Sequence, residues 1–282
     1  MIINNENIFL IILAFVWIIG AIIQDLRRRE VDNIWNFSLI GFALAYRLSV
    51  SMYSDNYLFF INGVLGFCIF LFLGNLFYFS RLFAGGDAKL LIALGTILPL
   101  SYDWVINFKI FGIYTILFFF TGAVYVMIWA LVLLFGNLNK FNKEFKKQVR
   151  RYKIIFFASG LLFMLGILFS IIFYEIIFFL FGILVLLFPI LFIFAKSIEE
   201  SFMIKSVYPN KITEGDWLYK DINVGGKIIK AKWDGVSKRE LNLMQKEYRG
   251  KVLIKIGIPF TPGFLFGLIA LIFVFWKYSA WF

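Results

Sequence analysis

Two aspartates stand out because of their places in the chain. Asp25 closes the first long apolar run, and Asp87 opens the fourth. Two carboxylates that share one site cannot both ionise cheaply, so one of them keeps its proton. The ionised member can take a proton from water, while the protonated member stabilises the oxyanion of an attacked carbonyl and later donates to the leaving amine. Such a pair could hydrolyse a peptide bond without a metal ion or a histidine.

The composition removes most other kinds of catalysis. The 282 residues include no histidine and one cysteine, Cys68, which lies inside an apolar run. Histidine-based catalysis, histidine metal sites, disulfides and cysteine-based metal sites are therefore excluded. Acid–base chemistry must come from carboxylates, and we expect no metal and no cofactor.

The hydrophobic content defines the class of protein. Hydrophobic residues make up 62% of the chain and charged residues 16%, against about 45–50% and about 25% in soluble domains. We therefore predict an all-α polytopic membrane protein with about eight transmembrane helices. The apolar runs cover residues 8–23, 34–50, 58–79, 88–100, 108–135, 154–173, 176–195 and 256–276.

The fourth run is unusually short. Its 13 residues fall below the ~20 that a helix needs to cross a bilayer. Asp87 could therefore begin this helix below the level of the lipid headgroups. An aspartate at that depth is costly unless it faces a water-filled cavity, and such residues are usually functional.

The distribution of charge predicts an orientation. Alternate loops hold 25 of the 28 lysines and arginines, and the net charge is +11. The positive-inside rule places these loops in the cytoplasm. The protein is then a multi-pass protein of the plasma membrane, with Asp25 and Asp87 both at the cytoplasmic face. A charge excess of this kind indicates membrane lipid as a partner, not nucleic acid.

The chain divides into three predicted parts. Residues 1–195 form a membrane domain of about seven helices that carries both aspartates, and residues 256–282 form the final transmembrane helix. Residues 196–255 form a small cytoplasmic α+β insertion before that helix. Gly225-Gly226 predicts a hairpin turn in it, and Ser237 followed by Glu240 predicts a helix-capping box. The insertion is either a solvated module or a substrate-docking element.

Each aspartate also has an ordinary explanation. Asp87 could cap a helix, and Asp25 could form a surface ion pair with the neighbouring arginines. Gly85-Gly86, directly before Asp87, favour a functional interpretation because glycine allows close backbone approach and unusual φ angles. An ion-coupled transporter that uses both aspartates as ion or proton sites is the alternative. Transporters usually place such acids near the midplane within repeats, and no repeat is evident here.

Three stretches of sequence resemble one family. Asp87 with the glycines before it, followed by Ala88-Lys89-Leu90, resembles the Gly-x-Gly-Asp (GxGD) membrane aspartyl proteases. Residues 25–33 are similar to the first catalytic segment of prepilin and preflagellin peptidases. Residues 255–267 resemble the last span of the archaeal members of that family.

The resemblance implies a function and a set of site residues. Asp25 and Asp87 would be the catalytic pair, with Gly85, Gly86 and Lys89 supporting the motif. The enzyme would be an aspartic-type endopeptidase that removes the short leader from prepilin-like or preflagellin precursor proteins at the cytoplasmic face. Lys89 could orient the substrate or Asp87, or extend toward the membrane surface.

Two departures from the family pattern matter. Ala84 stands where the family has its first motif glycine, so the backbone there could be less permissive. The chain also lacks the cysteines of the zinc loop in bacterial relatives, which implies an archaeal-type enzyme that only cleaves. Within the pair, a helix N-terminus favours an ionised Asp87 and a helix C-terminus disfavours an ionised Asp25. The positive charges of Arg27–Arg29 favour an ionised Asp25 and so act against these dipole effects. Taken together, the effects slightly favour Asp87 as the base.

Overall fold

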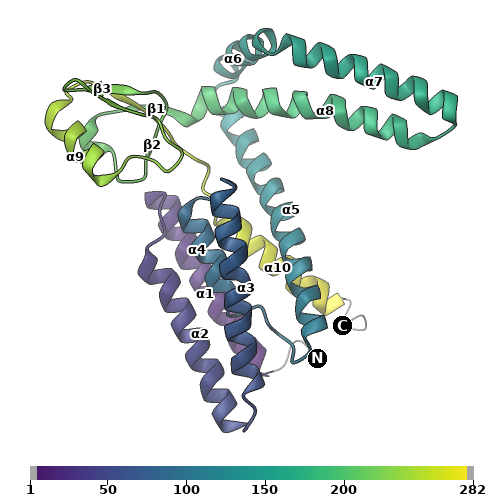
Figure 1. The fold of residues 1–282 in the computed structure, drawn as a ribbon, viewed down its shortest axis with the longest axis vertical. Helices are drawn as coiled ribbons and strands as arrows, with labels where there is room; N and C mark the ends of the chain where they lie inside the picture. The colour runs from purple at the N-terminus through teal and green to yellow at the C-terminus, as the bar shows by residue number, and fades with distance from the viewer. Residues whose placement is uncertain (1–4, 278–282) are drawn as a thin grey trace. The chain divides into compact units, whose positions relative to one another are not determined.

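The computed structural model describes residues 5–277, and it confirms a mostly helical protein with a small sheet region before the last helix (Figure 1). The chain forms two compact units. Unit 1 comprises residues 5–128 and 258–277 of the described part, and unit 2 comprises residues 129–257. Unit 2 thus groups the insertion with the last two helices of the predicted membrane domain, residues 1–195.

Unit 1 is a helical bundle in which α1 to α4 lie side by side (Figure 1). Its elements are α1 (Asn5–Arg28), α2 (Asn33–Tyr53), α3 (Leu58–Phe79), α4 (Gly85–Leu94), α5 (Trp104–Gly136, up to residue 128) and α10 (Pro262–Lys277). One apolar core, built mostly from Leu, Ile, Ala and Phe, joins these helices. The bundle therefore gives rigid support to side chains at the helix ends.

The helices agree with the predicted apolar runs, but not all of them are long. Each of the eight runs contains a helix. Among the described residues, five helices are long and apolar enough to cross a membrane, namely Glu6–Arg28, Leu58–Phe79, Trp104–Gly136, Lys153–Phe173 and Ile176–Met203. The structure therefore supports a multi-pass membrane protein.

The fourth run is helical over an even shorter stretch than predicted. α4 ends at Leu94, and the chain then turns before Pro99. Arg47 explains this ending, because its guanidinium is fully buried and donates to the carbonyl oxygens of Thr96, Ile97 and Pro99 and also of Phe59. Because the Arg47 side chain supplies hydrogen bonds to these carbonyl oxygens, they do not need the backbone N–H donors that a further helical turn would provide.

Two tryptophans fix α2 against α1. The Trp17 Nε1 donates to the carbonyl of Trp35 at 3.0 Å, and the Trp35 Nε1 donates to the carbonyl of Trp17 at 2.8 Å. A Cβ at position 20 would collide with the Trp35 ring, so Gly20 makes the close approach possible. The pair holds the part of α1 that leads to Asp25.

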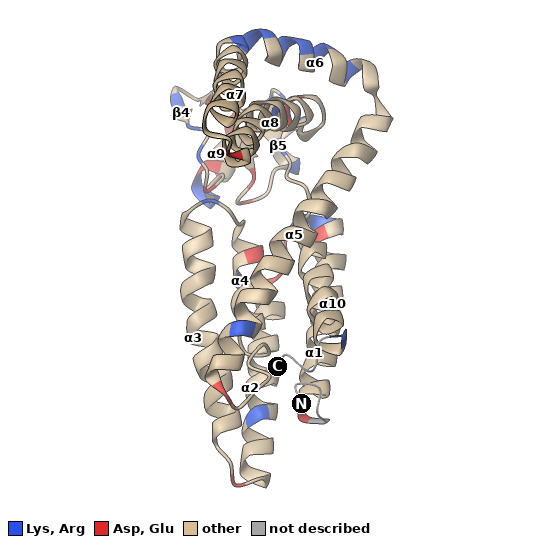
Figure 2. Cartoon of the chain, turned by 90° about the vertical axis from the view of Figure 1, so that its right-hand side faces the viewer, with Lys and Arg blue, Asp and Glu red and all other residues tan. Residues whose placement is uncertain are grey.

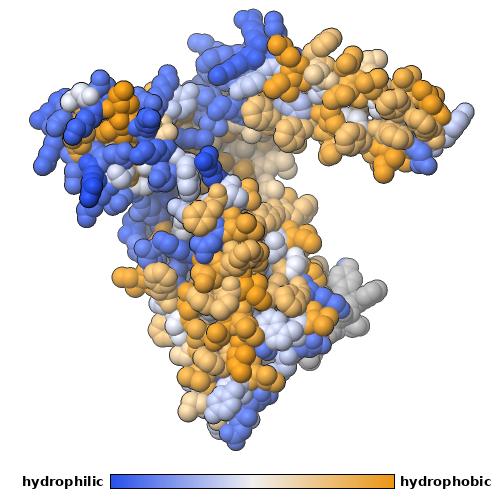
Figure 3. All heavy atoms as spheres, viewed as in Figure 1, coloured by the Kyte–Doolittle hydropathy of each residue, from blue (hydrophilic) through white to orange (hydrophobic). Residues whose placement is uncertain are grey.

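Unit 2 combines an apolar hairpin with the insertion. Its elements are the rest of α5, α6 (Leu138–Arg151), α7 (Lys153–Phe173), α8 (Ile176–Ile198), the π-helix η1 (Glu199–Met203), β1 (Ile204–Val207), the 3-10 helix η2 (Pro209–Lys211), β2 (Trp217–Leu218), β3 (Ile222–Val224), β4 (Lys227–Ile229), α9 (Lys238–Glu247) and β5 (Val252–Lys255). α7 and α8 reverse direction at Tyr174, whose φ is 55°. Their outer surface is almost entirely apolar (Figure 3), as expected of helices that face lipid.

The insertion contains the α+β elements that the sequence indicates. β1, β5 and β2 form one antiparallel sheet, and β3 pairs with β4 around Gly225-Gly226, both of which have positive φ. The capping box is also present, because Ser237 and Glu240 bond each other's backbone N–H groups. A small apolar core around Met244 fills the space beneath these elements.

Candidate active site

Asp25 lies in the last turns of α1 and points into unit 1. Its side chain is 8% exposed. Its Oδ2 accepts a hydrogen bond from the Thr261 hydroxyl at 2.9 Å and another from the Thr261 backbone N–H at 3.4 Å. The structure thus joins Asp25 to the beginning of α10, and Asp25 is not the surface ion pair that its arginine neighbours could have indicated.

Asp87 lies in the first turn of α4, as the sequence predicts. Its half-buried carboxylate takes a hydrogen bond from the backbone of Ala84, which precedes the helix, and the charge of Asp25 acts on it directly. Asp87 is therefore not the N-cap of its helix, since α4 begins at Gly85 and Ala84 holds the N-cap position without a side-chain cap bond. Unit 1 brings the two predicted carboxylates into one site.

The residues before Asp87 differ from the expectation in one respect. Gly85 and Gly86 have no unusual φ angle, because they form the start of α4. A Cβ at either position would meet other atoms no closer than 3.8 Å, so packing does not require glycine. Ala84 has a φ of −69°, which any residue adopts, so the missing first motif glycine causes no strain. The two glycines instead leave the backbone beside Asp87 uncovered.

Lys89 forms a hydrogen bond with Asn33 in the structure. Its Nζ donates to the Asn33 Oδ1 at 2.6 Å, which ties α4 to the first residue of α2. This contact supports the helix that carries Asp87. The structure therefore gives Lys89 a role in holding two helices together.

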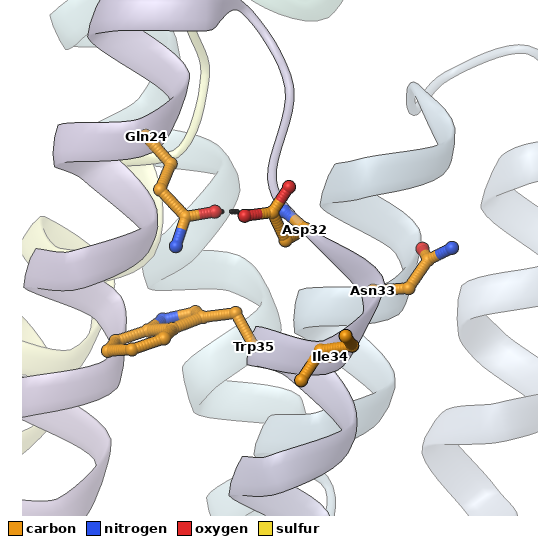
Figure 4. Close-up of a pocket in the computed structure, with 5 residues that line it drawn as sticks. All are labelled: Gln24, Asp32, Asn33, Ile34 and Trp35. Carbon is orange, nitrogen blue, oxygen red and sulfur yellow. Dashed lines mark hydrogen bonds between the residues drawn. The ribbon is translucent and has the colours of Figure 1, made fainter.

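A recess of about 460 Å³ opens beside the link between α1 and α2 (Figure 4). It is lined by Gln24, Asp32, Asn33, Ile34 and Trp35. The Gln24 Oε1 accepts the backbone N–H of Asp32 at 2.9 Å, and Arg28 pairs with the Asp32 carboxylate at 2.7 Å. The polar groups of Asp32 are thus engaged in holding the loop that follows Asp25.

Two residues near the pair were not predicted from the sequence. Thr261 touches Asp25, and the half-buried Tyr125 of α5 lies within electrostatic range of Asp25 and Arg29. A threonine just before a proline at the beginning of an apolar run is an N-cap signal, so Thr261 could have been found as a helix start. Its contact with Asp25 could not be predicted, because 236 positions separate the two residues.

A multi-pass helical protein with two carboxylates at neighbouring helix ends has the arrangement expected of a membrane aspartyl protease. Comparison with known proteins gives the particular family. The profile described as "Type IV leader peptidase family" matches residues 11–132, which include both aspartates. This region of the chain is similar to that family.

The curated relatives are archaeal. The chain is 30% identical over 157 residues to a preflagellin peptidase of Methanococcus maripaludis, covering 51% of this chain and 66% of the relative. It is 29% identical over 145 residues to that of Methanococcus voltae, covering 48% and 60%. For Methanocaldococcus jannaschii the identity is 32% over 121 residues, covering 41% and 51%. The matches thus span at most 66% of the relatives' lengths. No solved structure gives a significant match.

Proposed function

We propose that this protein is a membrane aspartyl endopeptidase that removes the short leader peptide from prepilin-like or preflagellin precursors. The proposal is carried by the proximity of Asp25 and Asp87 in a region that matches the leader peptidase family. The relatives are named preflagellin peptidases, which favours a flagellin-like precursor. Nothing in the comparisons supports the ion-coupled transporter.

The proposed chemistry uses the two carboxylates in opposite protonation states. The ionised member removes a proton from water, and the resulting hydroxide adds to the scissile carbonyl carbon. The protonated member hydrogen-bonds the oxyanion and then gives its proton to the amine as the C–N bond breaks. The products are a carboxylic acid and an amine, and a proton exchange within the pair restores the starting state.

The open backbone beside Asp87 supports this chemistry. Because Gly85 and Gly86 carry no side chains and nothing lies within 3.8 Å of where a Cβ would be, an extended peptide can approach the first turn of α4 closely. We place this site at the cytoplasmic face of a plasma-membrane protein with about eight spans. The support is the concentration of Lys and Arg in alternate loops.

The basic helix α6 supports contact with membrane lipid. Within unit 2 its apolar side packs through Phe141 and Phe145 against Phe194. The opposite side exposes a row of cations (Figure 2). These are Lys140, Lys143, Lys146, Lys147, Arg150 and Arg151. A surface of this kind is attracted to anionic headgroups by about 1 kcal/mol per cation.

The test is cleavage of a co-expressed precursor. Asp25→Asn and Asp87→Asn each remove one acid–base group, so each should lower the cleavage rate by about 10²–10⁴-fold. Precursor flagellin and precursor pilin are supplied separately, and the mature product is separated by gel and its new N-terminus sequenced.

Asp55→Asn is the matched control. Asp55 is an exposed aspartate of unit 1 with a φ of 50°, and asparagine tolerates that conformation well. This variant should cleave at the wild-type rate. If Asp25→Asn or Asp87→Asn also cleaved at that rate, or if a serine-protease inhibitor or a chelator abolished cleavage, the proposed function would be wrong.

A further inference from the structure

The side chain of Thr261 is bonded to a carboxylate of the proposed pair. Thr261 is 1% exposed, and both its hydroxyl and its backbone N–H donate to the Asp25 Oδ2. We infer that Thr261 is a positioning residue that fixes Asp25 as the ionised member of the pair, so that Asp25 is the base that activates water. The inference rests on the proposed function and assigns the roles within it.

The start of α10 directs two donors at Asp25. Pro262 is the first residue of α10, and Thr261 stands directly before it in the N-cap position. A backbone N–H at this position has no partner within the helix. That N–H therefore bonds Asp25. The positive end of the helix dipole also points toward the carboxylate and favours its charge. This effect opposes that of α1, whose C-terminal end disfavours an ionised Asp25.

The support of Asp87 is weaker. Within residues 5–277, the interactions shown for its carboxylate are a hydrogen bond with the backbone of Ala84 and the electrostatic effect of Asp25. The charged and titratable groups that share the site with Asp25 are Asp87 from α4, Tyr125 from α5 and Arg29 after α1. Hydrogen-bond donors and a cation favour the charged form of a carboxylate. When one member of a close pair is held ionised, the other keeps the shared proton.

This assignment reverses the roles favoured from the sequence. The sequence places Asp25 at the end of one helix and Asp87 at the start of another, and the comparison of these two dipoles favours Asp87 as the base. The structure adds the start of α10, which supplies a third dipole and two donors to Asp25. With these included, Asp25 accepts the proton of water and Asp87 donates to the leaving amine.

Close helix packing holds Thr261 in place. A Cβ at Gly267 would lie 2.9 Å from the Phe118 Cα, and a Cβ at Gly263 would lie 3.3 Å from the Gly122 Cα. Small residues at both positions let α10 lie directly on α5, as is common between membrane helices. The position of Thr261 is therefore fixed by backbone contacts and not by a flexible loop.

The experiment compares Thr261→Val with Thr261→Ser in the full-length protein, using the precursor that the wild type cleaves. Valine keeps the branched shape and removes the hydroxyl, so kcat should fall about 10- to 100-fold, with KM unchanged. Without the hydroxyl Asp25 protonates more readily, so the acidic limb of the pH–rate profile should move to higher pH. Serine restores the hydroxyl and should return kcat to within about threefold of wild type.

The controls separate this role from a general effect on the fold. Thr115→Val removes a half-buried hydroxyl of α5 that donates only to the carbonyl of Phe111, so it should leave kcat and the pH profile unchanged. Thermal unfolding in detergent is measured for every variant. If Thr261→Val does not fold, Thr261→Ala, which adds no bulk, gives the same comparison.

Three results would overturn the inference. These are a wild-type kcat and pH profile in Thr261→Val, a serine variant as slow as the valine variant, or a shift of the alkaline limb in place of the acidic one. Each of them leaves the proposed function standing, provided that Asp25→Asn and Asp87→Asn are still inactive. Cleavage by those two asparagine variants would instead show that the proposed function itself is wrong.

Discussion

The two units differ in how deeply they bury their charged side chains. Among the described residues, the buried charged side chains are Asp25 and Arg47, and both belong to unit 1. Unit 2 places its ion pairs at partly exposed positions, such as Lys255 with Glu199 and Lys232 with Glu240. A buried charge needs fixed partners, whereas an exposed pair contributes about 0–1 kcal/mol. Unit 1 therefore carries the polar groups on which structure and proposed chemistry depend.

The strongest test of this difference is Arg47. Arg47→Ala leaves buried carbonyls at Phe59, Thr96 and Pro99 without their donor, at a cost of roughly 1–3 kcal/mol for each unsatisfied group. We expect the free energy of unfolding to fall by about 3 kcal/mol or more. Arg47→Lys should recover only part of this loss, because an ammonium cannot reproduce the planar fork. Thermal unfolding in detergent measures both effects.

Lys109→Ala is the control for Arg47. Lys109 is an exposed basic residue of unit 1, and its removal should change the free energy of unfolding by less than about 0.5 kcal/mol. If Arg47→Ala were no more destabilising than Lys109→Ala, the buried hydrogen bonds of Arg47 would not stabilise unit 1, and the contrast between the units would fail.

The structural role of Arg47 could not be predicted from the sequence. The residue is recognisable only as one of three basic residues outside the basic loops. Its partners are backbone carbonyls, which carry no signature in the sequence. The pairing of Asp25 with Asp87 was predictable, because alternating spans bring their ends to the same face. The contact of Asp25 with Thr261 was not, since it depends on how closely α10 approaches α1 and α5.

The insertion was the more predictable region. Its hairpin and its capping box are local, and each is specified by residues a few positions apart: Gly225-Gly226 in one case, Ser237 and Glu240 in the other. The length of α4 was only partly predictable, because the apolar run continues to Leu100 whereas the helix ends at Leu94. Hydropathy does not report that ending, which Arg47 and Pro99 impose.

The next prediction concerns the contact of α10 with α5. Gly267→Ala would place a Cβ 2.9 Å from the Phe118 Cα, and because a backbone atom cannot give way cheaply, α10 must shift. We expect a loss of about 1–3 kcal/mol in the free energy of unfolding. Cleavage should fall as well, since the shift moves Thr261 from Asp25. Unfolding in detergent and cleavage of the precursor are measured together.

Gly112→Ala is the matched control on α5. Nothing lies within 4 Å of a Cβ at Gly112, so alanine should raise the stability of the helix by about 0.5–1 kcal/mol and leave cleavage unchanged. Equal effects of Gly112→Ala and Gly267→Ala would mean that glycine acts only through helix propensity and that close packing does not position α10.

The smallest expected effect belongs to unit 2. The pKa of Glu240 is held below its usual range by hydrogen bonds from the backbone and then the hydroxyl of Ser237. Glu240→Gln removes the charge at the start of α9, at a cost of about 0.3–1 kcal/mol at neutral pH. Because the folded pKa is depressed, the wild-type advantage exists above the unfolded pKa and is lost as the pH falls through the folded pKa.

Unfolding of wild type and Glu240→Gln at neutral and acidic pH measures this effect, with Glu214→Gln, an exposed glutamate of the same unit, as the control. The difference between wild type and Glu240→Gln should disappear in acid, while Glu214→Gln should show no difference at either pH. A loss that persisted in acid would mean that the charge of Glu240 is not its cause. A loss at neutral pH that exceeded the loss in Arg47→Ala would mean that unit 2 also depends on a fixed charge. The contrast between buried and exposed charges would then not separate the two units.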